Sequence, residues 1–282
     1  MRPVQWLKNV FVFAALIFDR QLFNYPALLR TVCGFALFCL LSSVVYIFND
    51  IADIEGDRQH PEKKRRPLAA GDLSIAHARI FGIVLLGLIF PLAYWLSPSF
   101  ALVALIYFLA NLAYSLWLKH IPLLDVLLLA GGYVLRVMGG VVLIQVERFS
   151  PWLYVVTTMG ALFVGFAKRR AELALLAEEA NTTRPVLGGY TIPILDQLIT
   201  IATSTTLIAY SLYTFSAPNL PANHSMMLTI PLVIYGIFRY LYLVAVEKKG
   251  GAPEIVVLSD RPFQVAVFLW GVMVFLIFYV FR

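Results

Sequence analysis

Nine apolar runs follow one another through this chain of 282 residues, and all but the short first run are near the length that crosses a lipid bilayer. A helix needs about 20 mostly apolar residues to span the hydrocarbon core. Apolar and polar residues show no alternation at the ten-residue spacing of outer-membrane barrel strands. We therefore predict an all-α integral membrane protein, whose first span is the shortest and most amphipathic. The predicted spans cover roughly residues 8–18 extended toward its flanks, 28–48, 76–96, 99–117, 122–145, 152–168, 192–216, 226–246 and 262–281.

The composition excludes several other classes of protein. Hydrophobic residues make up 61% of the chain and charged residues only 13%, whereas a soluble domain carries about 45–50% apolar and about 25% charged residues. An ordinary soluble enzyme, a disordered chain and a disulfide-stabilised secreted scaffold are therefore excluded. Cys33 and Cys39 lie in one apolar run and are predicted to be small buried hydrophobes. The net charge of +6 indicates membrane orientation and anionic partners rather than nucleic acid.

The distribution of basic residues predicts the orientation. With the N-terminus in the cytoplasm, the inner segments hold 15 of the 22 Lys and Arg residues, the outer segments hold 4, and the rest lie within spans. Cytoplasmic loops of membrane proteins are rich in Lys and Arg. We therefore predict a cytoplasmic N-terminus and an external C-terminus. The long charged connections after spans two, six and eight then lie in the cytoplasm, where we expect the active-site loops.

An acidic cluster closes the second apolar run. If the helix continues through it, Asn49, Asp50, Asp53 and Asp57 share one face. Like charges at this spacing repel one another, and hard oxygen ligands suit Mg²⁺, which binds one or two carboxylates together with substrate phosphates. The alternative is a solvated acidic helix end, but ionisable groups at the mouth of an apolar bundle are usually functional. Glu55 is predicted to point elsewhere.

Four basic residues, 63–66, follow the acidic cluster. They could anchor the protein beside lipid headgroups, or they could bind phosphate, since Arg matches phosphate oxygens in a bidentate manner. Both roles stay open for the run as a whole. Lys63 and Arg66, three residues apart, are predicted to face the site.

The pattern Asn-Asp-x-x-Asp-x-x-x-Asp over 49–57, followed by His60-Pro61 and by Arg-Pro-Leu-Ala-x-Gly over 66–71, resembles the first signature of the UbiA prenyltransferase superfamily. The resemblance implies a single UbiA-like transmembrane domain, 1–282, with nine helices. It also implies that Mg²⁺ on a pyrophosphate binds at Asn49, Asp50, Asp53 and Asp57, the last three acting as catalytic residues.

The second half of the chain departs from the aromatic prenyltransferases of that superfamily. Most of them carry a second Asp-x-x-x-Asp motif after span six, where this chain has Lys168-Arg169-Arg170 and then Glu172. We therefore predict no second metal site and expect cations to bind another anionic group directly. For the mid-span Arg136, a structural pair with Asp125 or another carboxylate and a ligand role are equally open. The remaining predicted substrate-binding residues are Lys119, Lys168, Arg169, Glu172, Tyr190 and Arg261.

These motifs, together with Pro253-Glu254 and Asp260-Arg261, resemble the polyprenyl-phosphate phosphoribosyltransferase branch of the superfamily. The resemblance implies Mg²⁺-dependent transfer of 5-phosphoribose from phosphoribosyl pyrophosphate (PRPP) to a decaprenyl-type phosphate, for cell-wall arabinan precursors, in the inner membrane of a prokaryote. Lys63, Arg66, Lys168 and Arg169 would share the 5-phosphate and the lipid phosphate.

Two of the implied ligands keep structural alternatives. Glu172 could bind a ribose hydroxyl or the metal, or could pair with Lys168. Tyr190 could donate to a phosphate, or could be a plain interfacial tyrosine.

Two other functions stay open. An aromatic or quinone-pathway prenyltransferase would use the first motif but leaves the missing second motif unexplained. A transporter or lipid carrier could bind phosphate with the same charges, although the sequence has no clear inverted repeat of interrupted spans. The oligomeric state, a homo-oligomer included, is also left open.

Overall fold

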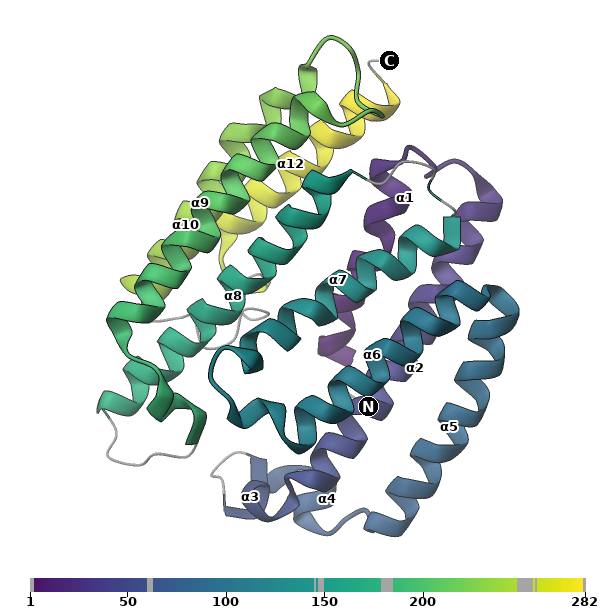
Figure 1. Cartoon of the computed structure of the whole chain (residues 1–282), viewed down its shortest axis with the longest axis vertical. Coiled ribbons are helices and arrows are strands. Elements are labelled where there is room, and N and C mark those ends of the chain that lie inside the picture. Colours follow the sequence, from purple (N-terminus) through teal and green to yellow (C-terminus); the bar gives the residue numbers. More distant parts are fainter. Residues whose placement is uncertain are drawn as a thin grey trace. The chain divides into compact units, whose positions relative to one another are not determined.

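The computed structural model describes residues 3–59, 63–144, 146, 150–178, 185–247, 256 and 258–280. These residues form helices, and no strand occurs among them, which confirms the predicted all-α class (Figure 1). The chain divides into two compact units. Unit 1 comprises Met1–Ile17, Gln21–Lys119 and Leu135–Val146, and unit 2 comprises Phe18–Arg20, His120–Val134 and Glu147–Arg282. The single domain over 1–282 stays a prediction.

Unit 1 contains the long helices that lead into and away from the acidic cluster. It also takes in the second half of α7, which runs Leu124–Ile144. The other elements are η1 (Pro3–Phe13), α1 (Ala14–Phe18, with its last residue in unit 2), α2 (Tyr25–Ala52), α3 (Ile54–Gln59), η2 (Lys63–Arg65), α4 (Pro67–Ala70), α5 (Ile75–Leu96), α6 (Pro98–Leu116) and η3 (Leu118–His120, with its last residue in unit 2).

Unit 2 begins with the first half of α7 and contains the C-terminal helices. Its other elements are α8 (Pro151–Glu178), η4 (Pro185–Gly189), α9 (Ile192–Ser216), η5 (Ser225–Thr229), α10 (Ile230–Ala245) and α12 (Arg261–Tyr279).

Side-chain caps explain where five of the long helices begin. A cap oxygen accepts a hydrogen bond from the backbone N–H three residues on, which satisfies a donor that has no partner inside the helix. In four of the five helices a proline occupies the first turn, where no backbone donor is needed. The five cap residues are Asn24, Ser74, Ser97, Thr191 and Asp260.

Aromatic rings and glycines pack the core of unit 1. The Phe38 ring makes edge contacts with Phe100 and Tyr107, at centroid distances of 5.4 and 5.5 Å. A Cβ at Gly139 would collide with the Phe38 ring, and one at Gly140 would collide with backbone of η1. These two glycines therefore allow close helix packing, as small residues do in membrane bundles.

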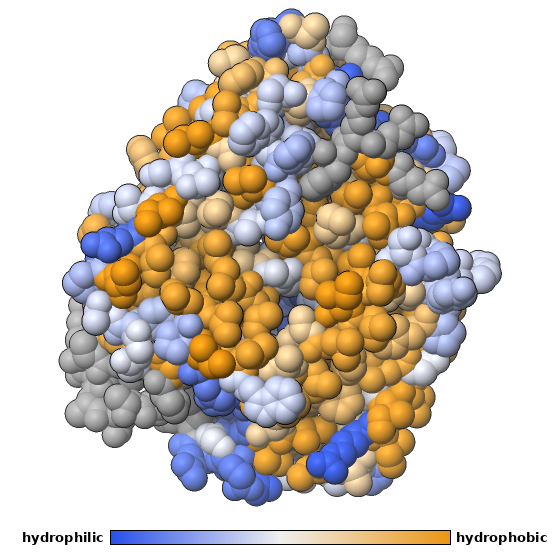
Figure 2. Space-filling view, in the orientation of Figure 1, coloured by the Kyte–Doolittle hydropathy of each residue, from blue (hydrophilic) through white to orange (hydrophobic). Residues whose placement is uncertain are grey.

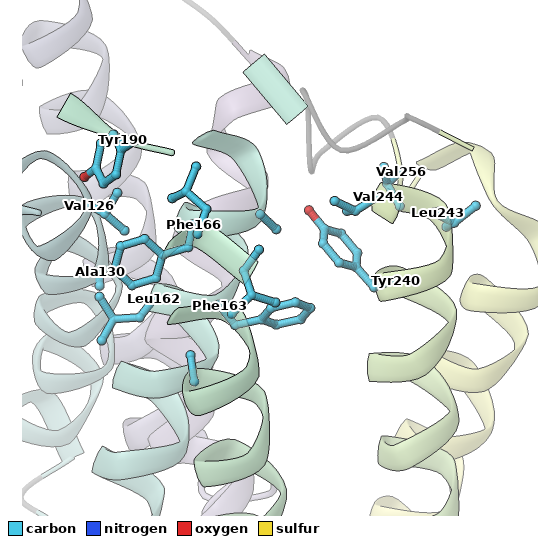
Figure 3. Close-up of a cluster of buried hydrophobic side chains, with 14 of the residues drawn as sticks. Val126, Ala130, Leu162, Phe163, Phe166, Tyr190, Tyr240, Leu243, Val244 and Val256 are labelled. Carbon is cyan, nitrogen blue, oxygen red and sulfur yellow. The ribbon is translucent and has the colours of Figure 1, made fainter. Parts of the chain in front are cut away.

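The core of unit 2 gathers side chains from α7, α8, α9 and α10. Figure 3 shows Val126 and Ala130 of α7 beside Leu162 and Phe166 of α8. On the other side of α8, the Phe163 ring meets the Tyr240 ring of α10 edge-on, at a centroid distance of 5.2 Å. This packing holds the C-terminal part of α8, which carries residues 168–172, against α7.

The outer surfaces of the helices are apolar. Large side chains such as Ile80, Trp95 and Phe268 are 61%, 85% and 68% exposed, and Figure 2 shows hydrophobic residues over much of the visible face. Soluble proteins rarely expose apolar patches of this extent. The exposed apolar surface and the long apolar helices identify the chain as a multi-pass membrane protein.

Seven helices in the described part of the chain are long and apolar enough to cross a bilayer: Tyr25–Ala52, Ile75–Leu96, Pro98–Leu116, Leu124–Ile144, Ile192–Ser216, Ser225–Ala245 and Arg261–Tyr279. They match predicted spans two to five and seven to nine. The first predicted span is a shorter apolar helix, Gln5–Phe18. The sixth corresponds to α8, which runs ten residues beyond the predicted end because its charged segment stays helical. The count of nine spans stays a prediction.

Candidate active site

The acidic cluster lies where α2 gives way to α3. The second helix does not continue unbroken through the cluster, because Asp53, with φ −96° and ψ 8°, ends α2. Repulsion between like charges and the weak helix propensity of Asp disfavour an unbroken helix here. The hydrogen-bond ladder nevertheless continues, from Asp53 N–H to Asn49 O (2.9 Å) and from Asp57 N–H to Asp53 O (2.8 Å). The i, i+4, i+8 spacing is therefore kept across the break.

Burial separates the residues of the cluster from Glu55. Asp57 is buried, and Asn49, Asp50 and Asp53 are half-buried. Glu55 is exposed and pairs with Arg58, at 3.5 Å. The prediction that Glu55 points away from the cluster is confirmed.

Two cations compensate the carboxylates. Arg66 Nη1 donates to Asp50 Oδ1 at 3.1 Å and to Asp57 Oδ2 at 2.5 Å. Lys119 Nζ, from the η3 turn after α6, donates to Asp53 Oδ1. The structure thus brings Asp50, Asp53 and Asp57 together with Arg66 and Lys119 inside unit 1.

The segment 66–71 explains how Arg66 reaches the cluster. Arg66 has an extended backbone, as expected for a residue before proline, and Pro67 starts the four-residue helix α4. Gly71 ends α4 at φ 88°, in the left-handed region that favours glycine. Buried Leu68 packs with Ile54 of α3 and fixes α4 against it. The Arg-Pro-Leu-Ala-x-Gly pattern therefore builds a short, anchored support for one guanidinium.

Lys63 and Asn49, the other predicted residues of this region, differ in exposure. Lys63 lies exposed at the start of η2, and Asn49 is half-buried one turn before Asp53. His60-Pro61, part of the motif, lies outside the described residues.

The donor set of the cluster can be tested against a divalent cation. In the described part of the chain, no three His, Cys, Asp or Glu side chains converge into a ready-made metal site. However, Asp50 and Asp57 both reach a single nitrogen of Arg66, and carboxylate oxygens are the hard ligands that Mg²⁺ prefers. The residues fit Mg²⁺ provided that Arg66 and Lys119 release the carboxylates.

Arg136 lies in a second polar network of unit 1. Its Nε donates to Asn9 Oδ1 at 2.7 Å, and its Nη2 donates to Tyr107 OH at 2.8 Å. The guanidinium also lies over the Tyr107 ring, 4.8 Å from the centroid. Of the alternatives left open for Arg136, a pair with Asp125 does not form, because eleven residues along one helix separate the two by about 16 Å. The ligand role of Arg136 stays a prediction.

Asp125 instead holds Arg169 in unit 2. Arg169 Nε donates to Asp125 Oδ2 at 2.6 Å, and Arg169 Nη1 donates to Glu172 Oε2 at 2.7 Å. The side chains of Asp125 and Arg169 are 0% and 1% exposed. Such a buried pair needs further hydrogen bonds to offset its desolvation.

Tyr190 supplies one of these bonds. Its hydroxyl donates to Asp125 Oδ1 at 2.6 Å and accepts from the backbone N–H of Leu123 at 2.6 Å. Burial, and then the hydrogen bond to Asp125, raise the pKa of Tyr190 to about 12. The hydroxyl therefore stays protonated as a donor. Leu123 has φ 71°, so this contact also supports an uncommon backbone conformation for a residue other than glycine.

The other predicted residues of unit 2 differ in exposure. Lys168 and Glu172 are half-buried, and Arg261 is exposed at the start of α12. Next to it, Asp260 caps α12 and accepts from Arg239 Nη2 at 2.7 Å. This pair gives Arg239 of α10 a structural role at the start of α12. Pro253-Glu254 lies outside the described residues.

Sequence reasoning missed the role of Asp125 as the anchor of Arg169. The available signal was an acidic residue at the start of an apolar span, where an ionisable side chain requires a partner. That signal indicates a pair, but the sequence alone does not say which cation supplies it.

The described residues define the class: an all-helical membrane protein with an acidic motif at the end of a long apolar helix. The chain belongs to the UbiA prenyltransferase family, whose model matches residues 9–256.

Individual relatives cover nearly the whole chain. A decaprenyl-phosphate phosphoribosyltransferase from Corynebacterium glutamicum is 33% identical over 275 residues, which is 96% of this chain and 82% of that protein. The enzyme of the same name from Mycobacterium tuberculosis is 32% identical over 277 residues, 96% of this chain and 90% of that protein. Among solved structures, a UbiA homologue from Archaeoglobus fulgidus bound to DMAPP and Mg²⁺ has a TM-score of 0.75 and 20% identity, covering 99% of this chain and 97% of that one. This last likeness supports the fold.

Proposed function

We propose that this transferase moves 5-phosphoribose from PRPP to a polyprenyl phosphate of the decaprenyl type, with release of pyrophosphate. The observation that carries the proposal is the cluster of Asp50, Asp53 and Asp57 held by Arg66 and Lys119. It combines the carboxylates that bind a metal with the cations that bind phosphate. The relatives named decaprenyl-phosphate phosphoribosyltransferase support this choice of substrates.

In this proposal Asn49, Asp50, Asp53 and Asp57 hold Mg²⁺. The metal, when bound, would neutralise the pyrophosphate and improve it as a leaving group. Arg66 and Lys119 would then bind phosphate oxygens, for which a guanidinium fork and a flexible ammonium are suited. The Mg²⁺ in the related solved structures supports the use of a divalent metal in the family.

The transfer itself needs little from the protein beyond positioning and charge. An oxygen of the lipid phosphate bonds to ribose C1, and the bond between C1 and the pyrophosphate oxygen breaks. Positive charge develops on C1, as in the oxocarbenium-like transition states of glycosyl transfer. The acceptor oxygen is already anionic, so no general base is required. Orientation and electrostatic stabilisation therefore supply the catalysis.

The ligands of the 5-phosphate and the lipid phosphate follow from the family resemblance. Lys63, Arg66, Lys168 and Arg169 are the proposed cations. Glu172 is the proposed acceptor for a ribose hydroxyl, and Arg261 is a further proposed substrate-binding residue. Exposure favours Lys168 over Arg169 for direct contact, since Arg169 is enclosed by Asp125 and Glu172. Burial and existing hydrogen bonds favour a supporting role for Tyr190.

The membrane arrangement extends the same proposal. We infer nine spans in a single domain, a cytoplasmic N-terminus and active site, and an external C-terminus, in the inner membrane of a prokaryote. The excess of Lys and Arg in the predicted inner segments supports this orientation. The product would serve arabinan precursor synthesis for the cell wall.

One assay separates this proposal from the alternatives. Purified protein in lipid nanodiscs is incubated with Mg²⁺, PRPP labelled in the ribose, and decaprenyl phosphate. In parallel it is given geranyl diphosphate with an aromatic acceptor. We expect labelled lipid and pyrophosphate in equal amounts from the first mixture only. Pyrophosphate release without ribosylated lipid, or turnover of the second mixture alone, contradicts the proposal.

A matched pair of variants connects the activity to the cluster. Asp53→Asn removes one carboxylate of the cluster and should abolish turnover. Asp196→Asn removes a half-exposed carboxylate that pairs with Arg170 at 2.5 Å in unit 2, and it should leave turnover near the level of the unmodified protein.

A further inference from the structure

Arg66 and Lys119 occupy one oxygen of each carboxylate that the proposed metal needs. Arg66 takes one oxygen from Asp50 and one from Asp57, and Lys119 takes one from Asp53. The pairs are largely shielded, with 25% of the Arg66 side chain and 16% of the Lys119 side chain exposed. Pairs of this kind are screened less by salt than surface pairs.

A metal ion and these cations compete for the same three carboxylates. A divalent ion that binds Asp53 next to the Lys119 ammonium meets both a shared ligand and a like charge. The same argument applies to Arg66, because its nitrogen bridges two of the carboxylates. Binding of metal alone must therefore break ion pairs without giving the two cations new partners.

We propose that Arg66 and Lys119 exchange partners during binding. They hold the carboxylates of the empty cluster and transfer to phosphate oxygens when metal and PRPP enter together. Each of the two residues then weakens the binding of metal alone and strengthens the binding of the donor. Metal and donor enter as a coupled pair, because the donor supplies the anions that take over the two cations. This inference rests on the proposed function and adds to it the order of events at the cluster.

The chain offers a matched control for charge. Arg65 is adjacent to Arg66 but lies exposed in η2. Replacing it removes the same formal charge from the same segment without freeing a carboxylate. A general electrostatic effect on metal affinity would appear in Arg65→Met as well as in Arg66→Met, whereas an exchange of partners would appear in Arg66→Met alone.

The first arm of the test measures metal binding without donor. Mn²⁺ is the probe, because it takes the same oxygen ligands as Mg²⁺ and because electron paramagnetic resonance measures the concentration of free Mn²⁺. We expect Lys119→Met and Arg66→Met to bind Mn²⁺ about tenfold more tightly than the unmodified protein, a coupling of ordinary size. Arg65→Met should change the affinity by less than about threefold, because an exposed charge is screened at physiological salt.

The second arm measures the donor. Binding of labelled PRPP is followed with saturating Mg²⁺ and without lipid acceptor, so that no transfer occurs. We expect Lys119→Met and Arg66→Met to weaken PRPP binding about tenfold, the loss of one charged hydrogen bond. The same substitutions thus act with opposite sign in the two arms. The inference is overturned if Lys119→Met and Arg66→Met bind Mn²⁺ no more tightly than Arg65→Met does. It is also overturned if the two variants bind both Mn²⁺ and PRPP more weakly than the unmodified protein, or if their PRPP binding is unchanged.

Failure of the proposed function would look different. If the unmodified protein does not bind PRPP with Mg²⁺, inorganic pyrophosphate replaces PRPP in the second arm, and the opposite signs still decide the exchange. Thermal unfolding is recorded for every variant. Lys119→Gln, which keeps a polar side chain of similar length, replaces Lys119→Met if the methionine variant unfolds.

Discussion

Tyr190 and Asp125 are 65 residues apart in the chain and share a buried hydrogen bond of 2.6 Å. The same tyrosine oxygen accepts from Leu123 N–H, and the other carboxylate oxygen of Asp125 holds Arg169. A single hydroxyl thus connects the segment before α9, the start of α7 and the charged part of α8. The arrangement makes Tyr190 a support of the network rather than a surface tyrosine.

Tyr190→Phe removes both hydrogen bonds of the hydroxyl and leaves a buried carboxylate oxygen and the partly buried N–H of Leu123 without this partner. We expect it to destabilise the protein by about 1–3 kcal/mol, the cost of unsatisfied buried polar groups. Unfolding of purified protein by heat or denaturant measures the loss. Tyr154→Phe, at a tyrosine that is 49% exposed, is the control and should have little effect. Equal stability of the two variants contradicts the assignment.

The raised pKa of Tyr190 makes stability depend on alkaline pH. The pKa is 10.0 for a free tyrosine and about 12 in the folded protein, so the folded state holds the proton more tightly than the unfolded state. The stabilisation is fully present below pH 10 and is lost as the pH rises toward 12. Tyr190→Phe should therefore lose less stability over this interval than the unmodified protein. Parallel declines of the two melting temperatures above pH 10 would exclude the effect.

Much of the fold follows from the sequence, because long apolar runs and cap residues act locally. Seven of the nine predicted spans coincide with long apolar helices, and prolines mark the first residues of α6 and α8, Pro98 and Pro151. The face shared by Asn49, Asp53 and Asp57 also follows from spacing alone. Such features depend on neighbours within a few residues.

The partners of the charged residues could not be predicted in the same way. Asp53 meets Lys119 across 66 residues, and Asp125 meets Arg169 across 44. Each choice depends on how helices pack, and several cations were equally available to each acid in the sequence. Arg136 illustrates this, because it donates to an amide and a phenol from η1 and α6, and the sequence singled out neither.

The buried pair of Asp125 and Arg169 should show strong coupling. Asp125→Leu removes the buried carboxylate that accepts from Arg169 Nε, and a loss of about 3–5 kcal/mol is expected for breaking one side of such a pair. Adding Arg169→Met removes the stranded charge and should restore much of that stability. Unfolding of the two single variants and the double variant gives the coupling energy. Additive losses would show that the two side chains do not depend on each other.

Gly71 provides a test of how the support of Arg66 is built. Its φ of 88° is unfavourable for any residue with a Cβ, although no neighbouring atom lies within 4 Å of the position that a Cβ would take. Gly71→Ala should therefore cost about 1 kcal/mol through backbone conformation alone, and Gly71→Asn should cost less, since asparagine tolerates the left-handed region.

Gly87, in the exposed middle of α5, also has no neighbour within 4 Å, and Gly87→Ala should be neutral or stabilising because alanine favours helix. Thermal unfolding compares the three variants, and a PRPP titration follows the expected rise in KM for Gly71→Ala as α4 loses its fixed end. An alanine that is tolerated equally at both positions would show that the left-handed turn does not constrain Arg66.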